Sequence, residues 1–134
     1  METIEHSTAI ISLRDDGIIR FQFHKNAVVD INAAFDYVKI IRELSHGIPR
    51  AFLLDTRDTF SNHTSEARQY MGRNAEALEF RIADAILVNS LPLRIVGNFY
   101  MKFDTPLHPV QIFKQEADAI TWLESVQLDV RKFK

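Results

Sequence analysis

The sequence predicts an α/β domain whose mixed, mostly parallel β-sheet is opened by a β-hairpin. Three observations lead to this fold class. Two early segments alternate apolar and polar residues, two later segments are continuously apolar, and amphipathic helical patterns lie between the apolar segments. Because strands that alternate with helices pair in parallel through right-handed crossovers, the predicted order is β-β-α-β-α-β-α-β-α.

The opening of the chain contains the predicted hairpin and the first helix. Residues 8–14 and 18–24 have alternating apolar residues, as in half-buried strands, and Gly17 between them tolerates the positive φ of a tight turn. The first helix is expected to begin after Asp30, which is a favoured N-cap residue type, and to end before Gly47. Its apolar residues recur at helical spacing: Ile31, Ala34, Phe35, Val38, Ile41 and Leu44.

Three further strands are predicted, and all of them are short and apolar. The first two are apolar without interruption, which is typical of strands covered on both faces of a sheet. The three strands cover residues 51–54, 85–88 and 110–113.

Three more helices are predicted from helical spacing of apolar residues. The second helix starts near residue 64 and continues to residue 78. Pro92 fits the first turn of a third helix over residues 92–103. The last helix covers residues 117–123, and residues 126–134 are left as a tail without assigned structure.

Composition indicates an ordinary globular protein. With 134 residues, 46% hydrophobic residues and no linker, residues 1–134 are expected to form one domain. The absence of cysteine and of a basic, apolar leader favours a cytoplasmic location, and no apolar segment is long enough to be transmembrane. A net charge of -2, spread along the chain, argues against nucleic-acid binding.

The order of elements and five short segments resemble a known family. The segments are Asp55-Thr56-Arg57, Ser65-Glu66-Ala67-Arg68, Ala83-Asp84-Ala85-Ile86, Pro109 to Phe113 and Ala119 to Leu123. Together they resemble the STAS or SpoIIAA-like domains of anti-sigma-factor antagonists and the related SEC14-like lipid-binding domains, and most specifically an uncharacterised bacterial STAS/SEC14-like family. The resemblance covers nearly the whole chain. It implies a SpoIIAA-like fold and a regulatory, protein-binding role.

The chain departs from this family at the phosphoacceptor segment. STAS antagonists carry an Asp-Ser-Ser-Gly-like segment at the start of the helix after the central strand. Residues 59–65 here read Thr-Phe-Ser-Asn-His-Thr-Ser, and no glycine follows the serine. The resemblance therefore transfers the location of such a site and not its mechanism.

Hydroxyl and charged residues around this helix start form a candidate anion or phosphoacceptor site. Unpaired N–H groups at a helix N-terminus attract phosphate or carboxylate groups, and nearby arginines can pair with them. The alternative is structural, because Ser and Thr are preferred N-caps and the charged residues can form surface ion pairs. The candidate residues are Asp55, Arg57, Ser61, Thr64, Ser65 and Arg68.

A second candidate site follows from the predicted parallel strands. Ligands of such sheets bind outside the carboxyl ends of the strands. Asp55, Thr56, Arg57, Asn89, Ser90 and Lys114 lie at these ends, and we call them the strand-end rim. Asp55, Ser90 and Lys114 also resemble a response-regulator receiver, but Asp15 and Asp16 lie in a hairpin turn, whereas a receiver needs its acidic pair at a strand end.

The predicted helix over residues 92–103 has apolar residues on more than one face. We expect it to be core on both faces, or else to provide a homodimer contact or one wall of an apolar, lipid-sized pocket. The candidate interface or pocket residues are Leu93, Val96, Phe99, Tyr100 and Phe103.

Signatures of catalysis, metals and cofactors are missing from the sequence. Common hydrolase, dinucleotide and nucleotide motifs are absent, and no two of the five histidines have a metal-site spacing. The first expectation is therefore a non-enzymatic regulatory or protein-interaction domain that binds another protein or a second copy of itself. The alternatives are a small apolar-ligand or lipid-binding SEC14-like carrier and, third, a receiver-like phosphoacceptor domain.

Overall fold

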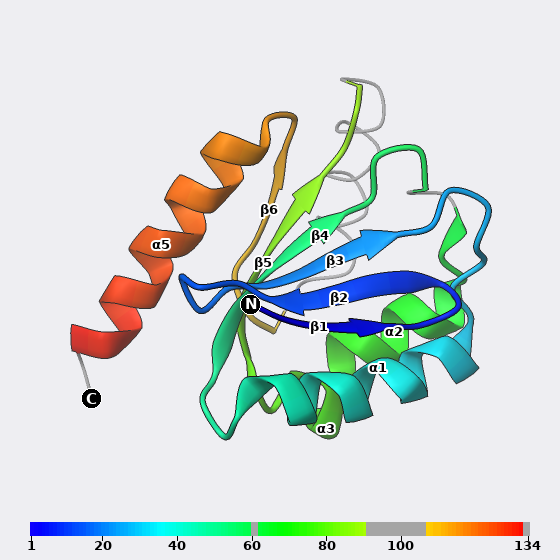
Figure 1. Cartoon of the computed structure of the whole chain (residues 1–134), viewed down its shortest axis with the longest axis horizontal. Helices are drawn as coiled ribbons and strands as arrows, with labels where there is room; N and C mark the ends of the chain where they lie inside the picture. The colour runs from blue at the N-terminus through cyan, green and yellow to red at the C-terminus, as the bar shows by residue number, and fades with distance from the viewer. Residues whose placement is uncertain (60–61, 91–106, 133–134) are drawn as a thin grey trace.

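A computed structural model describes residues 1–59, 62–90 and 107–132. Within these ranges, a six-stranded sheet carries helices on both faces (Figure 1). The spatial order of the strands follows their order in the chain, from β1 to β6. The predicted fold class, α/β with a mixed and mostly parallel sheet, is confirmed.

The first three strands are antiparallel. They are β1 (Glu2–Glu5), β2 (Ala9–Leu13) and β3 (Ile19–Phe23). Gly17 has a φ of 86°, as the predicted turn between β2 and β3 requires. β1 was not predicted, because it is a short edge strand whose only partly buried side chain is Ile4, and exposed polar residues at a sheet edge hide the alternation.

The last three strands continue the sheet in parallel. They are β4 (Arg50–Asp55), β5 (Arg81–Leu87) and β6 (Val110–Phe113). β5 begins four residues before the predicted apolar run, and the added segment contains the charged residues Arg81 and Asp84, which pair with each other inside the sheet. The carboxyl ends of the three strands lie at the same edge.

Within the described ranges, three helices cover one face of the sheet. They are α1 (Ile31–Ser45), which Asp30 caps as predicted, α2 (Ser65–Arg73) and α3 (Ala75–Leu78). The sequence predicted one helix over residues 64–78. That prediction is wrong, because Asn74 has an extended backbone and caps α3 with its side chain, so the helix is interrupted there.

The other face is covered by α5 (Glu116–Lys132), which packs on β4, β5 and β6 (Figure 1). Ala119 and Leu123 are fully buried in this contact. The sequence left residues 126–134 without assigned structure, but the helix continues because Val126 still packs on the core and Gln127 donates a hydrogen bond of 3.3 Å to the carbonyl of Asp16.

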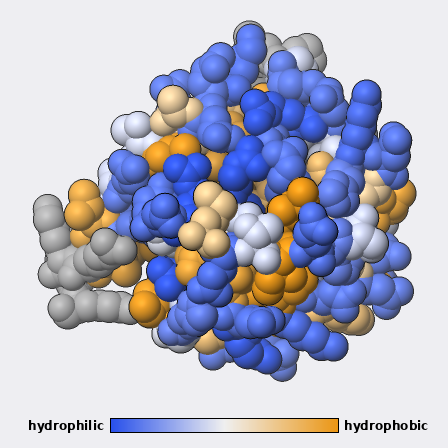
Figure 2. Space-filling model, viewed as in Figure 1, coloured by the Kyte–Doolittle hydropathy of each residue, from blue (hydrophilic) through white to orange (hydrophobic). Residues whose placement is uncertain are grey.

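The surface seen in Figure 2 is mostly hydrophilic, with apolar patches between hydrophilic residues. The most exposed large apolar side chains of the described ranges include those of Val28, Leu107 and Leu128, at 62%, 59% and 59%. In those same ranges, no helix combines the length and the apolar character needed to cross a bilayer.

Candidate functional site

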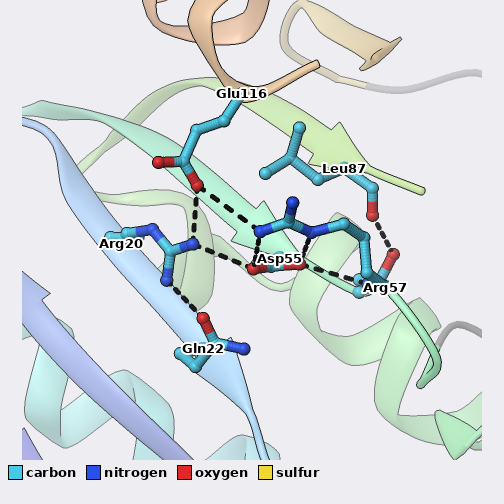
Figure 3. A network of polar contacts seen from close by, with 7 residues as sticks. Arg20, Gln22, Asp55, Arg57, Leu87 and Glu116 are labelled. Atoms are coloured by element: carbon cyan, nitrogen blue, oxygen red, sulfur yellow. Dashed lines mark hydrogen bonds and ion pairs between the residues drawn. The ribbon is translucent and has the colours of Figure 1, made fainter. Parts of the chain in front are cut away.

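Four charged residues meet at the carboxyl end of the parallel strands. Asp55 is the last residue of β4, and its side chain is 1% exposed. The Arg57 Nε and Nη2 atoms donate to the two carboxylate oxygens of Asp55 at 2.9 and 2.7 Å. The Nη2 atom of Arg20 adds a third hydrogen bond of 2.9 Å (Figure 3). We call these residues, together with Glu116, the salt-bridge cluster.

Strand register brings Arg20 to Asp55. Ile19 and Phe21 point into the core, so Arg20 lies on the opposite face of β3. The parallel register places Gln22 beside Asp55, and Gln22 accepts a hydrogen bond of 2.7 Å from Arg20 that orients the guanidinium group. The sequence analysis did not identify Arg20, because a polar residue in an alternating strand indicates only the outward face.

Glu116 completes the cluster from the opposite side. It is the first residue of α5, and Figure 3 shows its side chain reaching from that helix toward both arginines. Its Oε1 atom lies 2.6 Å from Arg20 Nη2 and 3.7 Å from Arg57 Nη2. The side chains of Glu116 and Arg57 are 35% and 41% exposed, so this half of the cluster faces solvent.

The cluster keeps Asp55 ionised. Burial alone would raise the pKa of Asp55, but the hydrogen bonds and charge of Arg57, together with the charge of Arg20, outweigh burial and hold that pKa below its usual value. The same hydrogen bonds raise the pKa of Arg57. A carboxylate with both oxygens engaged and a low pKa is suited to holding a structure together and poorly suited to proton transfer at neutral pH.

The strand-end rim is only partly a connected site. Asp55 and Arg57 are in contact, and Thr56 ties β4 to β5 through a hydrogen bond of 2.6 Å to the carbonyl of Leu87. Asn89 donates instead to Asp58 at 2.6 Å. The other two rim residues follow β5 and β6, with Ser90 half-buried and Lys114 exposed.

The candidate phosphoacceptor residues lie at the start of α2. Thr64 is the N-cap, and its hydroxyl accepts a hydrogen bond of 3.1 Å from the Ala67 N–H. Ser65 is exposed, and its hydroxyl accepts a hydrogen bond of 3.2 Å from Arg68. Ser61 lies outside the described residues. Thr64 thus makes the N-cap contact that the structural alternative describes, whereas Ser65 has an exposed side chain.

Substituting Thr64 tests the capping role. Thr64→Ala removes the oxygen that satisfies the Ala67 N–H, so we expect the free energy of unfolding to fall by about 1 kcal/mol. Chemical denaturation measures this loss. Thr64→Ser keeps the oxygen and Ser65→Ala changes an exposed side chain, so both variants should stay close to the wild type; equal losses for Thr64→Ala and Ser65→Ala would contradict the assignment.

Comparison with known proteins assigns the family. A family model described as a domain of unknown function, DUF7793, matches residues 11–127. The chain belongs to this family. A comparison with curated proteins found no significant match.

Two solved structures resemble this member of the DUF7793 family. An uncharacterized protein of the DUF3478 family with a SpoIIAA-like fold, from Shewanella loihica PV-4, is 14% identical, and the match covers 92% of this chain and 98% of that one with a TM-score of 0.57. A protein with unknown function from Arthrobacter sp. FB24 is 21% identical over 90% and 95% of the two chains, with a TM-score of 0.33. The first match confirms the SpoIIAA-like fold that the resemblance implied.

The sequence also suggested an apolar contact surface and a receiver-like acidic site in this DUF7793 chain. The apolar surface over residues 92–103, with Leu93, Val96, Phe99, Tyr100 and Phe103, lies outside the described residues. The receiver-like arrangement is not formed. Asp15 and Asp16 precede β3, at the amino ends of the parallel strands, whereas Asp55 lies at their carboxyl ends, so the three acids cannot share one cation.

A second charged group, which the sequence analysis also did not identify, is buried in the sheet. Arg81 and Asp84 form an ion pair with side chains only 5% and 6% exposed, and His108 Nε2 lies 3.0 Å from the Asp84 carboxylate. Arg81 also donates to the Met71 carbonyl, and its guanidinium carbon lies 5.6 Å from the centre of the Phe52 ring. No signal in the sequence separates these charges from surface charges.

Two of the histidines in the described ranges pack against interior side chains. His63 packs against the Phe23 ring with ring centres 4.6 Å apart, and burial lowers the pKa of His63 to about 4. His108 lies beside Asp84 with its side chain 10% exposed. Neither completes a metal site within the described ranges, where no three His, Cys, Asp or Glu side chains are grouped suitably.

Proposed function

We propose that this chain is a non-enzymatic regulatory or protein-interaction domain that contacts a partner protein through the strand-end rim. The observation that carries this proposal is that hydrogen bonds from two arginines occupy the Asp55 carboxylate. This carboxylate is fully engaged by Arg20 and Arg57, and it therefore stabilises the edge of the sheet at which ligands of parallel sheets bind.

The groups around Asp55 are suited to contact with a protein. Arg57 and Lys114 expose cationic side chains, Asn89 exposes an amide, and Arg57 is held in place by its two hydrogen bonds to Asp55. Arginine is enriched in protein interfaces, and a side chain that is already ordered loses less conformational entropy on binding. The rim therefore offers ordered polar contacts on a rigid support.

Site-specific crosslinking tests the proposal. A photoreactive p-benzoylphenylalanine at position 114 lies on the rim, whereas the same residue at position 39 lies on the exposed side of α1, across the sheet from α5. Irradiation of the host cells should give a discrete protein adduct from position 114 and none from position 39. Absence of an adduct at position 114, or the same adducts from both positions, would rule out the rim as the contact surface.

A further inference from the structure

The two acids of the salt-bridge cluster differ in how firmly they are held. Asp55 uses both oxygens, accepts hydrogen bonds from two arginines and is buried. Glu116 contacts the arginines through Oε1 alone and is 35% exposed. The Asp55 side chain is therefore held in one position, whereas the Glu116 side chain is partly exposed and contacts the two guanidinium groups through one oxygen.

Removing the Glu116 side chain from the arginines would cost the fold little. Ion pairs that solvent reaches contribute weakly to stability, and the side chains of Arg20 and Glu116 are 20% and 35% exposed. α5 is held on the sheet by Ala119 and Leu123, which are fully buried and lie beyond the first residue of the helix. A rotation of the Glu116 side chain can thus uncover the arginines while α5 stays docked.

The uncovered arginines would form a receptor for an oxyanion. Arg20 and Arg57 carry two positive charges against the single negative charge of Asp55, so these three residues have a net charge of +1. Asp58, whose charge also acts on Arg57, accepts a hydrogen bond from Asn89. Guanidinium groups bind carboxylate and phosphate oxygens through paired, charge-assisted hydrogen bonds. The position that Glu116 Oε1 occupies, 2.6 Å from Arg20 and 3.7 Å from Arg57, is one that an incoming carboxylate oxygen can take.

We infer that Glu116 is an internal competitor, and that an acidic side chain of a partner protein replaces it on Arg20 and Arg57. The inference rests on the proposed function and adds the chemistry of the partner. Lys114 is exposed, follows β6 and lies two residues before Glu116, so it adds a positive charge at the same edge of the sheet. An acidic protein segment is therefore the partner that this part of the rim fits.

Anisotropy of a fluorescein-labelled hexaglutamate peptide at low ionic strength tests the competition. Glu116→Gln removes the competing charge, so the peptide should bind roughly two- to five-fold more tightly than to the wild type. Glu124→Gln makes the same charge change at an exposed position of the same helix and should leave the affinity nearly unchanged. If both variants tighten binding equally, the effect is one of net charge, and the inference is wrong.

Arg57→Lys tests the receptor itself. The variant keeps the positive charge but loses the planar guanidinium group with its several N–H donors. We expect about five-fold weaker peptide binding. A readout independent of variant stability is the Arg57 Nε–H resonance of the wild type, which should shift on titration with hexaglutamate and stay in place with hexalysine. No shift with hexaglutamate would overturn the inference.

The crosslinking experiment separates failure of this inference from failure of the proposed function. A partner that crosslinks at position 114 equally well in the wild type and in Glu116→Gln and Arg57→Lys backgrounds would overturn the inference and leave the proposed function standing. Stronger crosslinking with Glu116→Gln and weaker crosslinking with Arg57→Lys would support both.

Discussion

Replacing Asp84 by alanine should lower the free energy of unfolding by about 3–5 kcal/mol. Asp84 is buried, and Arg81 and His108 both contact its carboxylate. Burial alone would raise the pKa of Asp84, but the charge of Arg81 and the interactions of His108 and Arg81 with the carboxylate outweigh it and lower that pKa, so the group is ionised at neutral pH. Asp84→Ala leaves the Arg81 cation inside the sheet without its counter-ion, and urea denaturation at pH 7 measures the loss.

Two further variants separate the buried pair from a general effect of losing an acid. Asp129→Ala removes an exposed carboxylate from α5 and should change stability by less than about 0.5 kcal/mol. The double variant Arg81→Met, Asp84→Leu removes both charges and fills similar volumes, so it should recover much of the loss. A single Asp84→Ala variant as stable as the Asp129→Ala control would contradict the assignment of a buried ion pair.

Stability should fall between pH 6.5 and pH 4.5 because of His63. The pKa of His63 is about 4 in the folded protein, against an ordinary value of 6.5, because burial first and then the charge of Arg68 disfavour the imidazolium form. In this pH range the unfolded chain binds a proton at His63 and the folded protein does not, so acid favours unfolding. A pKa difference of roughly 2.5 corresponds to about 3 kcal/mol when the titration is complete.

The pH dependence of matched variants isolates this contribution. His63→Leu should flatten the decrease in unfolding free energy between pH 6.5 and pH 4.5, whereas His24→Leu, at an exposed position, should leave it unchanged. Asp55 and Asp84 contribute little in this range, because their pKa values lie below the ordinary carboxyl value. If the unfolding free energy of His63→Leu falls between pH 6.5 and pH 4.5 as steeply as that of the wild type, His63 does not cause the loss of stability in acid.

The α/β class and most elements could be predicted because they depend on local patterns. Alternation in β2 and β3, the uninterrupted apolar run in β4 and the Asp30 cap of α1 each reflect whether neighbouring side chains face the core or the solvent. The errors fall where a local pattern was overridden or absent. Asn74 interrupted a continuous helical pattern by capping α3, and the exposed side chains of β1 hid its alternation.

The candidate site was predictable only in part. Asp55 and Arg57 could be placed at the end of β4, because both follow a buried apolar run and lie two residues apart. Glu116 is 96 residues from Arg20, and nothing in its local sequence distinguishes it from the other acids of α5. The sequence therefore identified Asp55 and Arg57 as site residues and did not identify Arg20 or Glu116.

By itself, the sequence determined the periodicity of the elements, their order and the buried faces of most of them, since these depend on interactions within a few residues. The tertiary structure decided which polar side chains meet. The register of β3 on β4 brings Arg20 to Asp55, and the docking of α5 brings Glu116 to both arginines. Such meetings depend on the relative placement of distant segments, and a slip of one residue in a strand turns every side chain to the other face.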